Sequence, residues 1–207
     1  MVLINIFVII GTIAFATSGA LIGIEKRLDL FGVIFLSITT AVGGGIIRDL
    51  MIGTVPPVAF IEPTYCIISV ISSLITFALY KNIIKLKNII IILDAIGLGV
   101  FTAIGSSTAF MHNMKQPFIV VTMGVITGIG GGLLRDVFVK DIPYVFKKEI
   151  YAVASIAGGL GLYFTYNADS KILSLYVCFI ITFIVRVLAV RYNINLPTYK
   201  ADIDQSM

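Results

Sequence analysis

The chain has 207 residues, of which 58% are hydrophobic and only 13% are charged, and its 15 Lys and Arg outnumber its 11 Asp and Glu by four. Charged residues make up about a quarter of an ordinary soluble domain, so this composition excludes a soluble globular protein and indicates an integral membrane protein. The cations lie in short segments between apolar runs, which excludes nucleic-acid binding through a basic face.

Seven uncharged apolar runs predict transmembrane helices, each of which needs about 20 residues, with ends expected to overrun the runs by a turn. In chain order they are Val2–Ile24, Leu30–Ile47, Pro63–Tyr80, Ala95–Met114, Gln116–Leu134, Ile150–Ala168 and Ile172–Val185. They are continuous, whereas the strands of a membrane barrel alternate in hydrophobicity. We therefore expect an all-α membrane protein of seven transmembrane helices.

Loop charges predict the orientation in a bacterial inner membrane. Every second loop is rich in Lys and Arg, with eleven in all, whereas the loops between them hold only Lys115 and Lys171. Positively charged loops stay in the cytoplasm, so we expect the amino terminus outside and the carboxyl terminus in the cytoplasm. Because no cation precedes the first run, we expect it to be a transmembrane helix and not a cleaved signal peptide.

An internal repeat divides the chain. The segment Gly43-Gly44-Gly45-Ile46-Ile47-Arg48-Asp49 returns as Gly130-Gly131-Gly132-Leu133-Leu134-Arg135-Asp136, and Pro56 and Glu62 recur at the same spacing as Pro143 and Glu149. Each copy holds three spans, and an odd number forces the second copy to enter the membrane from the opposite side. We expect inverted repeats over residues 1–87 and 88–168, a seventh helix over 169–192 and a cytoplasmic tail over 193–207.

The two glycine triplets lie inside the second and fifth predicted helices. Three successive glycines weaken a helix, so we expect both helices to be broken there, with each break facing protein or a water-filled cavity. Such a break would offer carbonyl groups to a cation and amide groups to an anion. The alternative is that the glycines allow close helix packing.

Arg48 with Asp49, and Arg135 with Asp136, follow the triplets by about one helical turn. Ionisable residues this deep in a membrane pair with one another or face water, and they mark transport pathways. Neighbours on a helix do not face each other, so we expect each Arg to pair across the structure, with the Asp of the other repeat. The pattern is that of a route with a charged gate at each end, although an anchor at the membrane interface is the alternative.

Three further residues are candidates for such a route. Asp94 begins the fourth predicted span, either as a helix cap or as a carboxylate that attracts cations. Ser18 and Ser106 lie at similar depths in the first and fourth spans, where they either line a pore or bond to their own helix.

Cys66 and Cys178 lack metal-ligand spacing, and no catalytic or phosphate-binding motif is present, so we expect no enzyme, metal site or cofactor.

The duplicated Gly-Gly-Gly-x-x-Arg-Asp motif, in inverted repeats followed by a seventh helix, resembles the bacterial branch of the trimeric intracellular cation channel (TRIC) family from about Phe7 to Arg191. The resemblance implies a homotrimer in which each protomer has its own pore for monovalent cations, chiefly K⁺ with some Na⁺, lined by the second and fifth helices. The pore residues that it implies are Gly43, Gly44, Gly45, Arg48, Asp49, Gly130, Gly131, Gly132, Arg135 and Asp136.

The same sequences are also similar to a group labelled as glycine transporters, so a secondary transporter of glycine or another small zwitterion is the alternative. The expected partners are two further copies of the chain, membrane lipid and the permeant cations. A specifically bound lipid stays open, because eukaryotic TRIC members bind phosphoinositide through basic residues that have no clear counterpart in this sequence.

Overall fold

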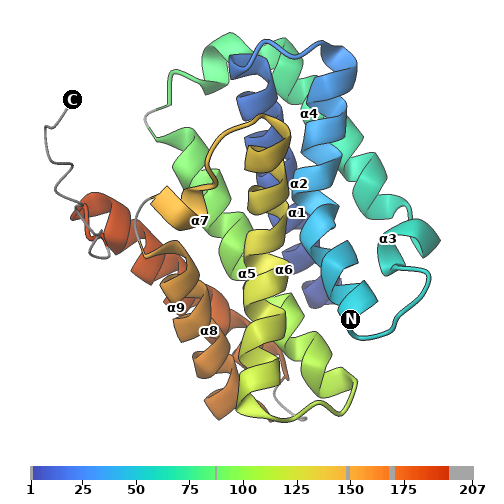
Figure 1. The fold of residues 1–207 in the computed structure, drawn as a ribbon, viewed down its shortest axis with the longest axis vertical. Coiled ribbons are helices and arrows are strands. Elements are labelled where there is room, and N and C mark those ends of the chain that lie inside the picture. Colours follow the sequence, from blue (N-terminus) through green and yellow to red (C-terminus); the bar gives the residue numbers. More distant parts are fainter. Residues whose placement is uncertain (1, 87, 148–149, 168–170, 196–207) are drawn as a thin grey trace, which may run out of the picture.

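A computed structural model describes residues 2–86, 88–147, 150–167 and 171–195 of the chain. The described residues form α-helices and contain no strand, which confirms the all-α prediction. The helices are α1 Val2–Glu25, α2 Leu30–Met51, α3 Val58–Ile61, α4 Thr64–Ile83, α5 Ile89–Met111, α6 Pro117–Phe138, α7 Tyr144–Lys147, α8 Tyr151–Thr165 and α9 Lys171–Arg191 (Figure 1). Glu149 and residues 196–207 of the predicted tail lie outside the described residues.

Six helices of the described chain, namely α1, α2, α4, α5, α6 and α9, are long and apolar enough to cross a membrane. Each has 20 to 23 residues in its apolar span, which corresponds to about 30 Å at 1.5 Å per residue. The sixth predicted span is the apolar helix α8, whose 15 residues cover only about 22 Å. Six of the seven predicted spans thus correspond to helices that are long enough to cross a membrane, and the remaining one is shorter than predicted.

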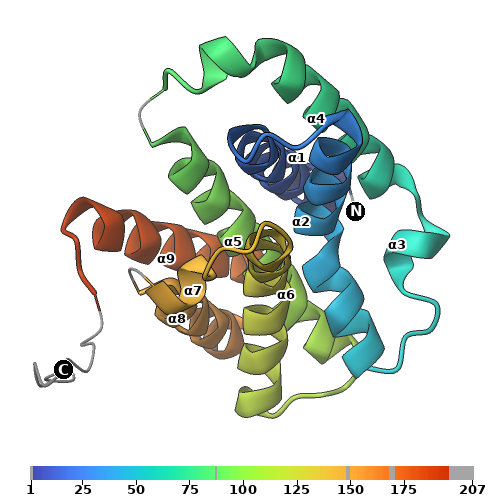
Figure 2. The same cartoon turned by 45° about the horizontal axis from the view of Figure 1, so that its top comes forward.

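The order of long and short helices occurs twice along the chain. Two long helices, one four-residue helix and another apolar helix make up α1 to α4, and the same order returns in α5 to α8. The short helices α3 and α7 were not predicted from the sequence. The additional helix α9 packs against α5 and α8 (Figure 2).

The two copies meet where α2 crosses α6 at the centre of the bundle (Figure 1). A Cβ atom on Gly44 would overlap the carbonyl oxygen of Thr127, and one on Gly131 would overlap the carbonyl oxygen of Thr40. Thr127 lies 87 positions after Thr40, and Gly131 lies 87 positions after Gly44. The repeat therefore relates the two contacts to each other. Because the later residue of one helix meets the earlier residue of the other, the two helices run antiparallel, as an inverted repeat requires.

The predicted helix breaks at the glycine triplets are absent. Both α2 and α6 run through their triplets as single helices, so this expectation is corrected. The first two glycines of each triplet instead let the backbones approach, since a Cβ on Gly130 would lie only 2.9 Å from the Cα of Gly44, and one on Gly43 would lie 2.6 Å from the Leu134 side chain. Close packing of this kind offsets the low helix propensity of glycine.

The bundle has two ends, which we name by the chain termini. At the amino-terminal face α1 begins, α2 ends and α6 begins, whereas at the carboxyl-terminal face α1 and α6 end, α5 begins and α9 ends. The loops after α1 and α6 are joined at the carboxyl-terminal face by an ion pair in which Lys26 Nζ lies 2.7 Å from Asp141 Oδ2. Since both side chains are about two-fifths exposed, this pair contributes little to stability.

Candidate functional site

Arg48 and Asp49 form a buried ion pair in the last turn of α2. The Arg48 Nε and Nη2 atoms both donate to Asp49 Oδ1, at 2.9 and 2.7 Å, and the two residues are 9% and 2% exposed. The expectation that this Arg pairs with the Asp of the other repeat is therefore wrong. A carboxylate near the carboxyl end of a helix opposes the helix dipole, and the adjacent guanidinium group compensates for its charge.

The Asp of the motif also positions the segment that follows the helix. The second oxygen of Asp49 accepts a hydrogen bond from the backbone N–H of Val58 at 3.0 Å, and that of Asp136 accepts one from Tyr144 at 2.9 Å. Val58 and Tyr144 are the first residues of α3 and α7. Each Asp thus joins the end of a long helix to the start of a short one. This role was not predicted from the sequence, although the matched prolines Pro56 and Pro143 lie in the segments concerned.

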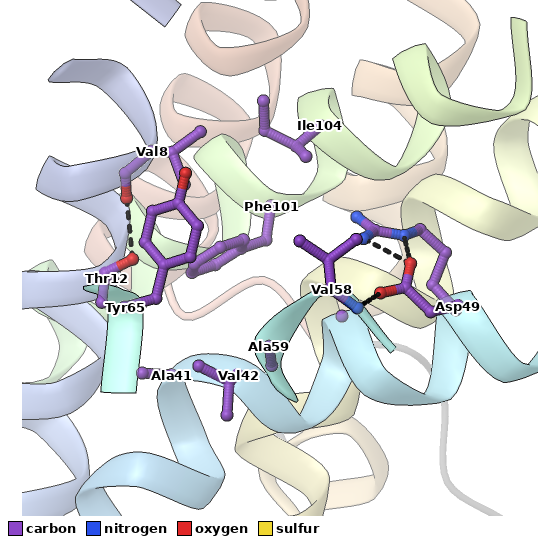
Figure 3. A pocket seen from close by; sticks show the side chains of 12 residues that line it. Val8, Thr12, Ala41, Val42, Asp49, Val58, Ala59, Tyr65, Phe101 and Ile104 are labelled. Atoms are coloured by element: carbon purple, nitrogen blue, oxygen red, sulfur yellow. Dashed lines mark hydrogen bonds and ion pairs between the residues drawn. The ribbon is translucent and has the colours of Figure 1, made fainter. Parts of the chain in front are cut away.

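The Arg48–Asp49 pair lines a cavity of about 160 Å³ near the amino-terminal face. Figure 3 shows Tyr65 and Phe101 on one side of this cavity and the hydrogen-bonded Asp49 on the other. The rest of the wall is mostly apolar, and it consists of Val8, Thr12, Ala41, Val42, Gly45, Val58, Ala59 and Ile104. We refer to Arg48, Asp49 and this cavity as the amino-terminal cluster.

Arg135 lies at the centre of a denser network at the other end of the bundle. Its Nε atom donates to Asp136 Oδ1 at 2.9 Å, and its Nη1 atom donates to Asp94 Oδ1 at 2.8 Å and to Ser18 Oγ at 2.7 Å. Arg135 is only 2% exposed, and its three partners are also buried. We refer to Arg135, Asp136, Asp94 and Ser18 as the carboxyl-terminal cluster.

The carboxyl-terminal cluster corrects two expectations. Arg135 does pair across the structure, but its distant partners are Asp94 of its own repeat and Ser18 of the first, and not Asp49. Asp94 is not a helix cap, because α5 begins at Ile89, five residues earlier. The uncharged run begins only after Asp94, because a single charge that is neutralised by a buried partner interrupts such a run without ending the helix.

The third glycine of each triplet has a different role from the first two. A Cβ on Gly45 would have Arg48 Nη2 as its nearest neighbour, at 3.9 Å. A Cβ on Gly132 would lie 3.3 Å from the Tyr151 hydroxyl and 3.8 Å from both Arg135 Nη2 and Asp94 Oδ1. These two glycines therefore face the charged clusters, while the two before them form the helix crossing.

The two clusters differ at matched positions. Phe15 and Gly19 of α1 correspond to Phe101 and Gly105 of α5, an offset of 86 residues, so Asp94 corresponds to Val8 and Ser18 to Ile104. Both Val8 and Ile104 line the amino-terminal cavity. Apolar side chains thus lie near Arg48 at the positions that correspond to the hydrogen-bonding partners of Arg135. The cavity at the carboxyl-terminal cluster measures only about 10 Å³. The interior is therefore wider beside Arg48 than beside Arg135.

Two further residues lie elsewhere than the sequence suggested. Ser106 is buried beside Gly124 of α6 and Gly159 of α8, and neither charged cluster includes it. Arg186, counted from the sequence as a loop charge, is 1% exposed inside α9. Its guanidinium carbon lies 4.9 Å from the centre of the Tyr151 ring, and it lines the small cavity beside Asp94 and Arg135.

Comparisons with known proteins agree with this architecture. The family model described as "Glycine transporter" matches the chain twice, over residues 5–81 and 91–167. The inner membrane protein YadS of Escherichia coli is 39% identical over 198 residues, which are 94% of this chain and 95% of that protein. Among solved structures, a TRIC cation channel has a TM-score of 0.88 at 36% identity, covering 96% of this chain and 98% of its own. A prokaryotic TRIC channel crystallised in 0.5 M KCl has a TM-score of 0.85 at 40% identity, over 94% and 99% of the two chains.

Proposed function

Because the chain belongs to the bacterial TRIC family, which the glycine transporter model also describes, we propose that it is a channel for monovalent cations, chiefly K⁺. In this proposal each protomer of a homotrimer in the bacterial inner membrane has its own pore. The pore runs between α1, α2, α5 and α6, past the two charged clusters.

The observation that carries the proposal is the presence of one buried charged cluster on each side of the α2–α6 crossing. Asp49 lies toward the amino-terminal face, while Asp94 and Asp136 lie toward the carboxyl-terminal face. Buried carboxylates offer a dehydrated cation the oxygen atoms that it needs, and ionisable groups inside a membrane protein are retained where they serve a pathway. The arginines neutralise these carboxylates while the route is closed.

The carboxyl-terminal cluster is the proposed gate. Arg135 holds α1, through Ser18, and α5, through Asp94, against α6, so the three helices cannot separate there while these bonds persist. The amino-terminal cavity lacks such a connection, since Arg48 bonds only to its neighbour among the contacts described. Conduction then requires Arg135 to release Asp94.

A secondary transporter of glycine is the second candidate, because inverted repeats whose two ends differ in cavity volume suit alternating access.

We expect purified protein in a planar bilayer with a KCl gradient to show discrete openings, with a reversal potential near that of K⁺ and no response to glycine. Gly45→Leu should abolish the openings by filling the amino-terminal cavity, while Met51→Leu on the exposed surface of the same helix should not.

Labelled-glycine uptake into vesicles that contain the same protein separates the two candidates. A transporter turns over too slowly to produce resolvable current steps, so saturable glycine uptake without openings would exclude the channel. Size-exclusion chromatography of each variant checks that a loss of current does not reflect a loss of folding.

The loop charges also support a proposed orientation, with the amino-terminal face outside. Single cysteines are to be introduced at Lys115, between α5 and α6, and at Lys85, between α4 and α5, in a protein lacking Cys66 and Cys178. An impermeant thiol reagent added to intact cells should label position 115, and position 85 should react only in inverted vesicles. Labelling of position 85 from outside would reverse the orientation.

A further inference from the structure

Tyr151, the first residue of α8, places its hydroxyl group inside the carboxyl-terminal cluster. The residue is only 4% exposed, and a Cβ on Gly132 would lie 3.3 Å from its hydroxyl oxygen. The same Cβ would lie 3.8 Å from both Arg135 Nη2 and Asp94 Oδ1, so three polar groups border one small space. Tyr151 therefore lies beside the bond between Arg135 and Asp94 that the proposed gate must break.

The Tyr151 hydroxyl is buried, yet it makes no hydrogen bond to any described group. It lies beside Asp94, and the two side chains are close enough to interact, but Asp94 Oδ1 already accepts a bond from Arg135 at 2.8 Å. A buried hydroxyl without a hydrogen bond destabilises the fold, and such groups are rare in native proteins. The arrangement seen in the structure thus leaves this hydroxyl available as a donor to Asp94.

Release of Asp94 by Arg135, which the proposed conduction requires, would give this hydroxyl an acceptor. The release leaves the Asp94 carboxylate without its cation, which is costly in a dry interior. A hydroxyl that donates to a carboxylate forms a charge-assisted hydrogen bond, about twice as strong as one between neutral groups. Tyr151 packs against Leu98 of α5, the helix that carries Asp94, so its hydroxyl stays beside Asp94 when Arg135 of α6 moves away.

The carboxylate and the hydroxyl occur together at one end of the molecule. The spacing of 86 residues assigns Val8 to Asp94, and the spacing of 87 residues between the matched prolines assigns Thr64 to Tyr151. Thr64 is exposed and is not among the residues that line the amino-terminal cavity. The first repeat therefore has an apolar residue in place of the acceptor and an exposed residue in place of the donor.

We propose that Tyr151 is a positioning residue, whose hydroxyl donates a hydrogen bond to the Asp94 carboxylate once Arg135 has released it. This bond stabilises the released arrangement and thereby favours opening of the gate. The inference rests on the proposed function, because it assigns a residue to one step of the proposed gating. Its test therefore includes a measurement that remains informative if the protein conducts no current.

Entry of solvent into the buried region beside Asp94 reports the released arrangement. Leu98, one turn after Asp94 and fully buried, is replaced by Cys in a protein lacking Cys66 and Cys178. Its reaction with uncharged iodoacetamide is followed in detergent. Tyr151→Phe should slow this reaction about tenfold, which corresponds to about 1.4 kcal/mol, because the released arrangement loses a hydrogen bond and the observed arrangement loses none.

Asp94→Val tests whether this effect depends on the carboxylate. Without an acceptor at position 94, adding Tyr151→Phe should leave the labelling rate unchanged. If removal of an unpaired hydroxyl merely stabilised the observed arrangement, the slowing would persist in Asp94→Val, and the inference would be wrong. If Asp94→Val does not yield folded protein, Asp94→Asn takes its place. Its uncharged oxygen is a weaker acceptor, so Tyr151→Phe should then slow labelling only about threefold.

Two controls exclude a general change in packing. Tyr163→Phe removes a hydroxyl from the same helix, where the ring stacks on Phe110, and should leave the labelling rate unchanged. A cysteine introduced in place of Ser106, which is buried elsewhere in α5, should react equally fast with and without Tyr151→Phe. The inference fails if Tyr151→Phe accelerates labelling at position 98 or leaves it unchanged, or if it slows both cysteines equally.

Recording in planar bilayers relates this step to the proposed channel. Tyr151→Phe should lower the fraction of time open about tenfold and keep the reversal potential near that of K⁺, because no charge has changed. If no variant conducts, the proposed channel function fails, while the labelling cycle still decides the role of Tyr151. If the parent protein conducts and Tyr151→Phe opens as often, the inference fails and the proposed function stands.

Discussion

Gly44→Ala and Gly131→Ala should each prevent the protein from accumulating as a stable folded bundle. At both positions a Cβ would overlap a backbone carbonyl oxygen of the facing helix, that of Thr127 or of Thr40, and a backbone cannot move aside as a flexible side chain can. Overpacking costs about 1–3 kcal/mol and occasionally more, and we expect the upper part of this range. The gain in helix propensity from Gly to Ala, about 1 kcal/mol, is too small to offset it.

The third glycine of the first triplet supplies the matched control. The nearest atom to a Cβ on Gly45 is 3.9 Å away, so Gly45→Ala should fold at least as well as the parent protein. The measurement is the yield of monodisperse protein in detergent together with its thermal aggregation temperature. If Gly44→Ala were as stable as Gly45→Ala, the close crossing of α2 and α6 would not be the reason for the glycine triplets.

The sequence predicted the membrane spans and the repeat well, because both depend on signals carried by the chain itself. A run of uncharged residues reflects the thickness of the bilayer, and the duplicated motif from Gly43 to Asp49 is visible without any structure. The glycine breaks were predicted from helix propensity alone. Propensity is a weak local preference, and the packing of Gly44 against α6 overrides it.

The candidate site was predicted only in part, because its geometry depends on which helices meet. Arg48, Asp49, Arg135 and Asp136 do form buried clusters, yet their partners could not be deduced from spacing within one helix. Arg186 was missed because any charge near the end of an apolar run resembles a loop charge. The two matched positions Val8 and Asp94 differ in the sequence, and aligning whole repeats instead of the motif alone would have revealed the asymmetry.

Asp94→Val should open the proposed gate and at the same time weaken its preference for cations. The variant gives the carboxyl-terminal cluster the residue that Val8 supplies at the other end, so Arg135 keeps only Asp136 and Ser18 among its described partners. Removing one member of a buried ion pair costs about 3–5 kcal/mol when the remaining charge stays dry. Water entering the cluster relieves this cost, so the fraction of time open should rise.

The charge of the cluster also changes in Asp94→Val. With Asp94 gone, the cluster loses one carboxylate while Arg135 keeps its charge, and the more positive cluster repels cations. The reversal potential in a KCl gradient should therefore move from that of K⁺ toward zero.

A control separates the loss of the contact between Arg135 and Asp94 from a general loss of negative charge at the carboxyl-terminal face. Asp141→Asn removes a carboxylate from the same face without touching the cluster and should change neither property. If Asp94→Val opened less often than the parent protein, the bond between Arg135 and Asp94 would not be what closes this end, and the gate would have to lie elsewhere along α2 and α6.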